Sequence, residues 1–421
     1  MKTFLLFLMT ACQIEDRTGF LQEQLWLDNR KWWYRDRDLL GGKFQKMADD
    51  PYNFMRGTLR LHWMDNNRPG REASSFLRLS ASSEILVFAD PHPENWAVLT
   101  TERGDRWLEM NDLDSAEFGA WHFDLRRLVL GLQTIAMDLE GCDCMDSIVA
   151  QTVLGYEHGL RNDWVFEGNI WGDLKAEADE EGEERKRFFK QTDAIDGENR
   201  LKDSIWPSVP IPVSDWISQT HFRLLDVARV YGTGVSSFPA IRYLVLFDEG
   251  SEEGQDDRLV QIREVGDPLV FDRKSFQNNV SRIRFSQEVL WESSANVWMH
   301  DSFVAEGLEW KTISYSSWLQ DIEHGKIEEG WVEGEYRSDD IDVLSYVLGA
   351  ALGARHRESE TRQGHRAGDI ILQDLEAGGG VSALVSEIFS FSLRDREQLF
   401  ADYTLFVDLI EEHGPLMGWE R

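Results

Sequence analysis

The stretch Phe88-Ala89-Asp90-Pro91-His92-Pro93-Glu94-Asn95 decides which fold this sequence predicts. It follows Ile85-Leu86-Val87, an apolar run typical of a short buried strand. Proline, aspartate and asparagine favour loops, so the strand is expected to end in one. A loop in this position can project its side chains into a cleft. Asp90, His92 and Asn95 are therefore candidate site residues.

A second polar segment, Asn111-Asp112-Leu113-Asp114, lies a short distance further along the chain. Residues 96–99 and 106–110 are mainly apolar and flank the turn residues Arg103-Gly104-Asp105, a pattern that predicts a hairpin. Because a hairpin of suitable length separates the two polar segments, we interpret them as parts of one site.

Together these segments supply the groups that phosphoryl transfer needs. The reaction asks for positioning and for neutralisation of phosphate charge, which carboxylates achieve through magnesium. Asp90 would take or orient the proton of a hydroxyl group. Asn95 and Asp112 would hold magnesium, and Asp114 would be a further ligand or a hydrogen-bond acceptor. The alternative is that these residues only form an Asp-Pro turn and cap nearby helices.

Composition limits the partners of the chain. Its 421 residues predict two to three domain-sized units, and 42% hydrophobic residues with 17 Trp are sufficient for a packed core. The formal net charge is −32. Because nucleic acids are polyanions, such a surface would repel them, and we expect no nucleic-acid partner.

The N-terminus leaves two interpretations open. The apolar run 3–9 precedes Thr10-Ala11-Cys12, which resembles a bacterial lipoprotein signal in which Cys12 is lipidated and anchors the protein to a membrane. Alternatively, the start codon is wrongly assigned and the protein is cytoplasmic.

The other cysteines, Cys142 and Cys144, are too few for a disulfide framework or a complete metal site, and we interpret them as ordinary cysteines.

Acidic and proline-rich stretches divide the chain into parts. The predicted parts are an N-terminal tail at 1–20, a catalytic-loop segment at 21–175, an acidic linker at 176–206, a β-rich segment at 207–330 and a helical segment at 331–421. Helices are predicted within 22–68 and at 123–139, 286–298, 341–357 and 381–410. Residues 224–230 are mainly apolar, and strands are predicted at 241–247, 259–265 and 310–315.

These motifs resemble two known groups of proteins. The Asp90–Asn95 loop resembles the catalytic loop of aminoglycoside-phosphotransferase-like kinases, and Asn111–Asp114 with Asp124-Leu125 resembles their metal-binding segment. From about Trp32 to Tyr403 the chain also resembles DUF2252, a family of uncharacterised bacterial proteins. The further motifs that carry this second resemblance include Lys43-Phe44 through Met47, Phe54-x-Arg56-Gly57, Asp124-Leu125-x-Arg127-Leu128, Asp226-Val227-Ala228-Arg229, Gly232-x-Gly234 and Gln261-x-Arg263-Glu264.

The resemblance implies an α+β, kinase-like fold of two lobes in permuted order, with the catalytic-loop lobe first and a nucleotide-lobe-like β unit later. ATP and Mg²⁺ would be the cofactors, and the acceptor would be an unknown small molecule or protein. Gly232 and Gly234 would cradle phosphates with backbone amides, and Arg263 would pair with them. Arg56 and Glu264 are further candidates at the nucleotide site. Glu264, Glu288 and Glu292 are all candidates to pair with Arg263.

Two departures from the family pattern favour an alternative function. Ser237 stands where a third glycine is expected, and Arg263 stands where the family usually has lysine. A catalytically degenerate, pseudokinase-like binding or scaffold protein would account for both. Metal-dependent hydrolysis by Asp90, His92 and Asn95 is a third hypothesis, which a single nearby histidine makes the weakest.

Several supporting roles are also predicted around the two segments. His92 would orient the loop rather than act as a base. Asp124 would secure the loop from the start of a helix, and His356 would be a packed or helix-capping residue. Trp96 and Trp121 are close enough in sequence to the motifs to line a cleft.

Overall fold

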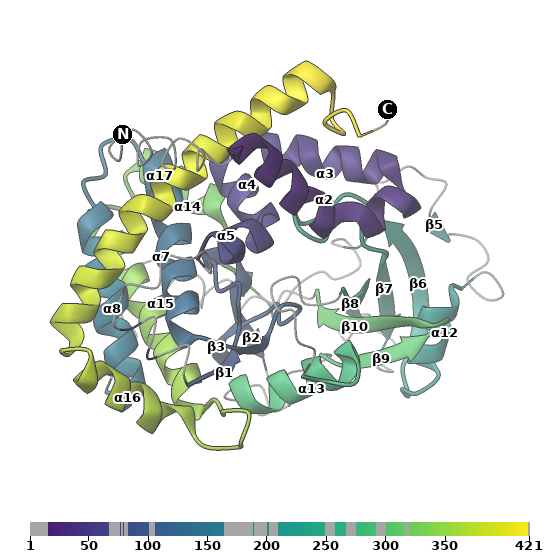
Figure 1. The fold of residues 1–421 in the computed structure, drawn as a ribbon. Coiled ribbons are helices and arrows are strands. Elements are labelled where there is room, and N and C mark those ends of the chain that lie inside the picture. Colours follow the sequence, from purple (N-terminus) through teal and green to yellow (C-terminus); the bar gives the residue numbers. More distant parts are fainter. Residues whose placement is uncertain are drawn as a thin grey trace, which may run out of the picture.

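The computed structural model describes residues 16–66, 76, 79, 83–100, 106–163, 188, 200–201, 209–248, 257–266, 275–291, 300–315 and 320–419. The signal-like segment and most of the predicted acidic linker lie outside the described residues. The fold is α+β: helices gather in one half of the molecule and the largest sheet lies in the other (Figure 1). None of the described helices combines the length and the hydropathy that a membrane span requires.

Four consecutive helices open the described chain, as the pattern in residues 22–68 predicts. They are α2 (Arg17–Arg35), α3 (Arg37–Asp49), α4 (Pro51–Gly57) and α5 (Leu59–Asn66). An aspartate starts each of the first three: the side chains of Asp16, Asp36 and Asp50 accept hydrogen bonds from the backbone N–H groups three residues on. These caps divide the segment into short helices that can fold over one another.

The other helices come from two distant parts of the chain. They are α7 (Trp121–Asp138), α8 (Met145–Arg161), α14 (His324–Glu333), α15 (Ser338–Glu358), α16 (Ala367–Ala377) and α17 (Val381–His413). α7 is buried over almost its whole length, as expected for a central core helix. Helices from both ends of the chain share one hydrophobic core. The C-terminal helices therefore complete the helical half that the N-terminal helices begin.

Glycines allow α8 and α15 to approach closely. A Cβ atom on Gly159 would lie 2.1 Å from the carbonyl oxygen of Ala350, and one on Gly353 would lie 2.1 Å from that of Tyr156. No side chain fits such a space, so glycine is required on both helices. The close crossing brings His356 of α15 beside Tyr156 of α8, with 2.9 Å between Nδ1 and the hydroxyl oxygen.

Short strands carry the two predicted site segments. They are β1 (Ile85–Val87), β2 (Trp96–Thr100), β3 (Arg106–Met110), β4 (Glu117–Gly119) and β11 (Gln320–Asp321), with the short 3₁₀ helix η1 (Pro93–Asn95) after the Asp90 loop. β1 pairs with β4, and β2 and β3 form the predicted hairpin. The N–H of Asn111 donates to the carbonyl of Asn95 at 2.9 Å, so the hairpin joins the two segments directly.

A six-stranded antiparallel sheet forms the other half, in the order β5-β6-β7-β8-β10-β9. Its strands are β5 (Arg200–Leu201), β6 (Arg223–Val230), β7 (Arg242–Asp248), β8 (Asp257–Glu264), β9 (Ser302–Ala305) and β10 (Leu308–Ser314), and α12 (Ile211–Ile217) and α13 (Asn279–Leu290) lie beside it (Figure 1). Apolar side chains form separate clusters on its two faces. The sheet thus has a core of its own.

Some predicted elements differ from the structure. The helix predicted at 286–298 begins earlier, at Asn279, where Asn278 and Ser281 form a capping box, and it ends at Leu290. The C-terminal helical segment begins at His324 rather than at residue 331. Cys142 and Cys144 form a disulfide, with Cα atoms 5.4 Å apart, so they are not the ordinary cysteines that we predicted.

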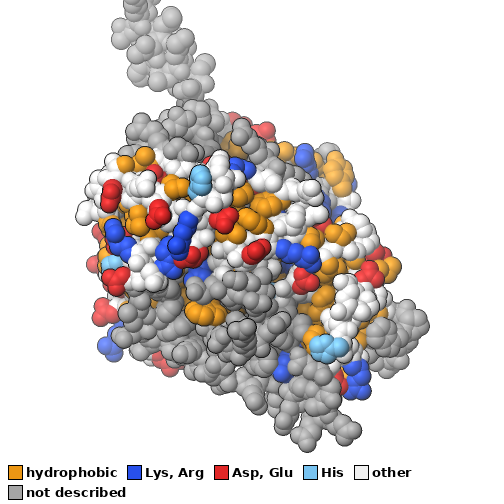
Figure 2. Space-filling model, turned by 90° about the horizontal axis from the view of Figure 1, so that it is seen from below, with side chains coloured by type: hydrophobic (Ala, Val, Ile, Leu, Met, Phe, Trp, Pro, Cys, Tyr) orange, Lys and Arg blue, Asp and Glu red, His pale blue; other side chains and the backbone are white. Residues whose placement is uncertain are grey.

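The described surface pairs many of its charges. Figure 2 shows acidic and basic side chains interspersed with hydrophobic ones on the face seen from below. Arg362 contacts Glu84 at 2.8 Å, and Arg366 contacts Glu358 at 2.6 Å. Exposed pairs of this kind stabilise a protein by only about 0.2–1 kcal/mol each. These exposed ion pairs therefore contribute little to the free energy of folding.

Candidate functional site

The Asp90 loop begins with a left-handed residue that the helical half holds in place. Ala89 has φ +66°, which is unfavourable for a residue with a Cβ. The carboxylate of Asp124, at the start of α7, accepts hydrogen bonds from the N–H groups of Phe88 and Ala89, each at 2.8 Å. The structure places Asp124 where it secures the loop, as the sequence predicts.

His356 contacts Asp124, and Tyr156 in turn contacts His356. Nε2 of His356 lies 3.1 Å from the Asp124 carboxylate, and Nδ1 of His356 lies 2.9 Å from the hydroxyl of Tyr156. Asp124, His356 and Tyr156 are all fully buried. His356 is packed, as predicted, but it also supports the loop. Buried hydrogen bonds linked in this way restrict one another and make the loop rigid.

Asp90 points into the site with one oxygen fixed. Its Oδ1 accepts from Nε of Arg127 at 2.8 Å, and Arg127 also donates to the carbonyl of Met55 at 2.9 Å. Burial raises the pKa of Asp90, although the charge of Arg127 opposes the rise. A carboxylate that is oriented and has raised proton affinity suits a proton acceptor.

Asn95 and His92, the other two candidates in the loop, have different surroundings. The side-chain amide of Asn95 donates to the carbonyl of Asp90 at 2.9 Å, so its amide oxygen is the atom that can face a cation. His92 is buried, and burial holds its pKa well below the usual range, so it is neutral at pH 7. Its ring packs edge-on against Tyr52. These contacts agree with a role in shaping the loop.

Asp112 and Asp114 form a closed ion cluster with two basic residues of the sheet. Arg263 of β8 donates to Asp112 at 2.8 Å and to Asp114 at 2.5 Å. Lys311 of β10 contacts Asp112 at 2.8 Å and Asp114 at 2.7 Å. The two site segments are thereby tied to the sheet. We call Asp112, Asp114, Arg263 and Lys311 the charge quartet.

The quartet controls the protonation of its acids. Burial alone would raise the pKa of Asp112, but the charges of Arg263 and Lys311 outweigh burial and hold that pKa well below the usual range. Burial likewise lowers the pKa of Arg263, and the two carboxylates more than reverse this. Asp112 and Arg263 therefore carry their charges at neutral pH, and each of them contacts a group of opposite charge.

The glycine-containing turn lies between β6 and β7. Gly232 and Gly234 have φ values of +66° and +74°, which favour glycine. Arg242 donates to the side chains of Thr233 and Ser237 and to the carbonyl of Ser237 at 2.9 Å. Ser237, the departure from the glycine pattern, is thus an anchor for this arginine. The hydroxyl of Ser237 also accepts from Arg263 at 3.2 Å.

Arg56 and the turn are joined to the loop. Arg56 forms an ion pair with Glu94 of the Asp90 loop, and its carbonyl accepts from the hydroxyl of Ser236 at 2.5 Å. Arg56 therefore braces the loop. It also lines the cleft described below.

Glu264 does not pair with Arg263, contrary to one of the predicted alternatives. Its carboxylate contacts Lys31 at 2.6 Å and Arg35 at 2.7 Å, both on α2. Neighbouring residues of a strand point to opposite faces, so the two side chains diverge. Glu288 is exposed on α13, and Glu292 lies outside the described residues. The acids that pair with Arg263 are Asp112 and Asp114.

One cleft brings the predicted groups together. It encloses about 930 Å³ of empty space, including the part open to solvent. Asp90, Asn95 and Asp112 line it from the helical half, and the sheet half contributes residues 233–237, Arg242 and Arg263. Trp96 and Trp121 were predicted to line a cleft, but neither of them lines this one. Both are fully buried, and their indole N–H groups donate to Pro91 and Asp374.

The donor chemistry fits magnesium only together with a further oxygen ligand. Within the described parts of the chain, no three His, Cys, Asp or Glu side chains are placed to hold a metal ion by themselves. Asn95, Asp112 and Asp114 offer oxygen atoms, which Mg²⁺ prefers. Mg²⁺ commonly takes one or two carboxylates and completes its shell with phosphates and water. A nucleotide phosphate would supply what the side chains do not.

Sequence reasoning missed Lys311 and Arg242. Each is a basic residue next to apolar strand residues, in Trp310-Lys311-Thr312-Ile313 and Ile241-Arg242-Tyr243. A charge within an otherwise apolar strand requires a partner, and this signal was available in the sequence. The identity of the partner was not, because Asp112 lies 199 residues before Lys311.

Comparison with known proteins gives one match. Residues 35–194 match DUF2252, a family described as an uncharacterized protein conserved in bacteria. The match supports the resemblance to that family. No curated protein and no solved structure matches the chain. The DUF2252 match includes Asp90, Asn95, Asp112 and Asp124, and it ends before the sheet that carries Arg263.

Proposed function

We propose that this protein is a phosphotransferase that moves a phosphoryl group from ATP to a hydroxyl acceptor with Mg²⁺, on a kinase-like fold of permuted order. One observation carries the proposal. An acidic loop and a glycine-containing turn with basic side chains line the same cleft from opposite halves of the molecule. Phosphoryl transfer needs these two kinds of surface facing each other.

The chain's own residues have distinct roles in this reaction. Asp90, oriented by Arg127, accepts the proton of the attacking hydroxyl. Arg263 and Lys311 bind the negatively charged phosphates. Asn95 and Asp112 would hold Mg²⁺, which neutralises phosphate charge when bound. Asp124 keeps the loop in position without contacting the reacting groups.

The charge quartet must exchange partners when nucleotide binds. A polyphosphate can replace the two carboxylates as the partner of Arg263 and Lys311. A divalent cation can replace the two basic residues as the partner of Asp112 and Asp114. Each charge then keeps a partner of opposite sign, so buried charges are not left uncompensated. ATP and Mg²⁺ are expected to bind together for this reason.

The quartet also supports a second candidate function, a catalytically degenerate binding or scaffold protein. In that case the four ion pairs are permanent, and they hold the two halves together. The contact between Ser237 and Arg242 agrees with the scaffold function. At this position the glycine expected for phosphate binding is replaced by a serine that holds a neighbouring side chain.

Calorimetric titration with ATP, with and without Mg²⁺, separates the two candidates. We expect the wild type to bind ATP with Mg²⁺ and Asp112→Asn to lose the effect of Mg²⁺. Without metal, Asp112→Asn should bind ATP more tightly than the wild type, because its basic residues have lost a competing carboxylate. Asp301→Asn, which alters an exposed aspartate paired with Arg284, is the matched control. No ATP binding by folded wild-type protein would support the scaffold function instead.

A further inference from the structure

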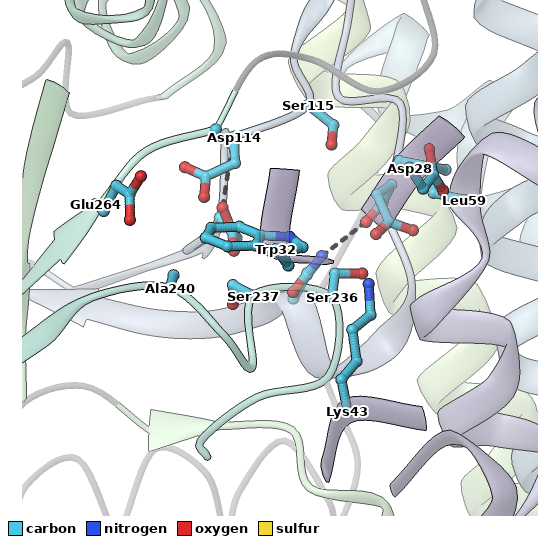
Figure 3. A pocket seen from close by; sticks show the side chains of 14 residues that line it. Asp28, Trp32, Lys43, Leu59, Asp114, Ser115, Ser236, Ser237, Ala240 and Glu264 are labelled. Atoms are coloured by element: carbon cyan, nitrogen blue, oxygen red, sulfur yellow. Dashed lines mark hydrogen bonds between the residues drawn. The ribbon is translucent and has the colours of Figure 1, made fainter. Parts of the chain in front are cut away.

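A second cavity opens from the Asp90 loop toward the N-terminal helices (Figure 3). It encloses about 750 Å³ of empty space, including the part open to solvent. Asp90, Asn95 and Asp112 line this cavity as well as the cleft. The helices α2, α3 and α5 contribute to its lining, and so do residues 236–237, Ala240, Glu264 and Gly266 of the sheet half. The cavity shares Ser236 and Ser237 with the cleft, so a molecule bound here would reach the Asp90 loop beside the proposed nucleotide.

A buried lysine extends into the cavity. Lys43 of α3 is only 2% exposed, and Figure 3 shows its side chain reaching toward the middle of the cavity. Its ammonium group donates to Oδ1 of Asn29 at 2.7 Å. An ammonium group has three N–H donors. The remaining donors can serve the oxygen atoms of a bound molecule.

A buried carboxylate oxygen lies at the same wall. Among the described residues, no group donates a hydrogen bond to the buried Oδ1 atom of Asp28, which lines the cavity. A buried acceptor without a donor is costly, so such atoms commonly mark a place where a ligand or water binds. Burial raises the pKa of Asp28, and the charge of Lys43 limits the rise. The Oδ1 atom of Asp28 therefore requires a hydrogen-bond donor, which a bound molecule can supply.

The rest of the lining combines apolar side chains with hydroxyl groups. Trp32, Leu59 and Ala240 provide apolar surface, and the indole of Trp32 lies across the cavity in Figure 3. Ser115 and Ser236 provide hydroxyl groups. An aromatic face together with an acid, a base and hydroxyl groups matches a ring that has apolar C–H faces and many hydroxyls. Four more carboxylates line the cavity, those of Asp90, Asp112, Asp114 and Glu264, and each contacts a basic residue outside the lining. Because Asp28 likewise has Lys43 as a neighbour of opposite charge, the lining favours a neutral molecule over an ion.

We infer that this cavity is the acceptor site and that it takes a neutral polyhydroxylated ring, a sugar or a cyclitol. This inference rests on the proposed phosphotransferase function. One acceptor hydroxyl loses its proton to Asp90 while its oxygen forms a bond to the γ-phosphorus of ATP. The bond from that phosphorus to the bridging oxygen breaks, and ADP leaves with the electron pair. Asp28 and Lys43 bind other hydroxyls and so select the acceptor.

The test measures binding and transfer separately. Glucose, galactose, mannose and myo-inositol at millimolar concentration are titrated into the full chain by calorimetry, and ADP formation is followed with Mg²⁺ and ATP. At least one ring should bind the wild type and stimulate ADP formation. Lys43→Met and Asp28→Asn should each weaken its binding by about tenfold or more, with ATP binding unchanged. Lys326→Met, an exposed lysine of α14, is the control.

Asp28→Asn keeps the shape of the side chain, so it tests the cavity even if Lys43→Met fails to fold. ATP binding without binding of any ring would overturn the acceptor inference and leave the phosphotransferase proposal standing. Equal ring binding by wild type and both variants would also overturn it, because the ring would then bind elsewhere. Ring binding without ATP binding would remove the acceptor role together with the proposed function.

Discussion

Lys311 lies directly opposite Arg263 in the register of the antiparallel strands β10 and β8. Two like charges at facing positions of a sheet repel each other. Here both contact Asp112 and Asp114 at distances of 2.5 to 2.8 Å. The sheet half therefore carries a pair of cations whose acidic partners, among the residues that the structure describes, come from the loop of the helical half. Neither half satisfies these charges without the other.

Substitutions of Lys311 and Asp114 should have coupled effects on the free energy of unfolding, because the two side chains form an ion pair. Lys311→Met leaves two half-buried carboxylates facing one arginine, and we expect it to lower the free energy of unfolding by about 1–3 kcal/mol. In the double variant Lys311→Met with Asp114→Asn, the loss should be smaller than the sum of the single losses by about 1–3 kcal/mol. Equilibrium urea denaturation of all four proteins measures this. Arg284→Met, in an exposed pair, should cost less than about 1 kcal/mol, and additive losses in the cycle would contradict the quartet.

Asp124 should be essential to the conformation of the loop. Asp124→Asn replaces one acceptor oxygen by an amide donor opposite the N–H groups of Phe88 and Ala89. We expect a loss of about 2–4 kcal/mol, because a buried N–H is left without a partner. Thermal and urea denaturation measure the loss. Asp146→Asn, on an exposed residue at the start of α8, should change stability by less than about 1 kcal/mol. Equal effects of the two variants would exclude this role for Asp124.

The crossing of α8 and α15 should not tolerate a methyl group. Gly353→Ala would place Cβ 2.1 Å from the carbonyl oxygen of Tyr156. Moving the helices apart should cost about 2–3 kcal/mol, which exceeds the gain of about 1 kcal/mol in helix propensity. Gly325→Ala, in α14 with open space around it, should be neutral or stabilising. A stabilised Gly353→Ala variant in urea denaturation would show that the helices do not cross so closely.

Glu264 should stabilise the protein above, but not below, the pH at which glutamate titrates. Burial alone would raise its pKa, but Lys31 and Arg35 outweigh burial and lower it from about 4.5. The unfolded chain then binds the proton more readily than the folded protein, so the stabilisation is full above the unfolded pKa. It is lost as the pH falls through the lower folded pKa.

Glu264→Gln should therefore be less stable than the wild type by about 1–2 kcal/mol at pH 7. The difference should shrink as the pH falls below about 4.5. Urea denaturation across this pH range measures both curves. The exposed Glu397 provides the control, since Glu397→Gln should show no such convergence. A difference that grows on acidification would reverse the sign that we assign to Glu264.

Elements with a strong local pattern could be predicted from the sequence. The helix α7, the hairpin of β2 and β3 and the strands β7, β8 and β10 of the larger sheet follow apolar periodicity and turn residues. The start of α13 was missed because Asn278 and Ser281 form its cap in a stretch with few apolar residues. Local signals thus located most elements but misplaced the ends that polar caps define.

For the candidate site, the sequence by itself determined the composition. It showed that Asp90, Asn95 and Asp112 follow strands, and that a glycine turn and a basic strand residue come later in the chain. Only the tertiary structure decided that Arg263 pairs with Asp112 and Asp114, that Lys311 joins them, and that Glu264 faces α2 instead. The physical reason is distance along the chain. Loop and strand preferences act between neighbouring residues. Arg263 and Lys311 lie 151 and 199 residues from Asp112 in the sequence. Over such separations, strand register and helix packing determine which charged side chains become neighbours.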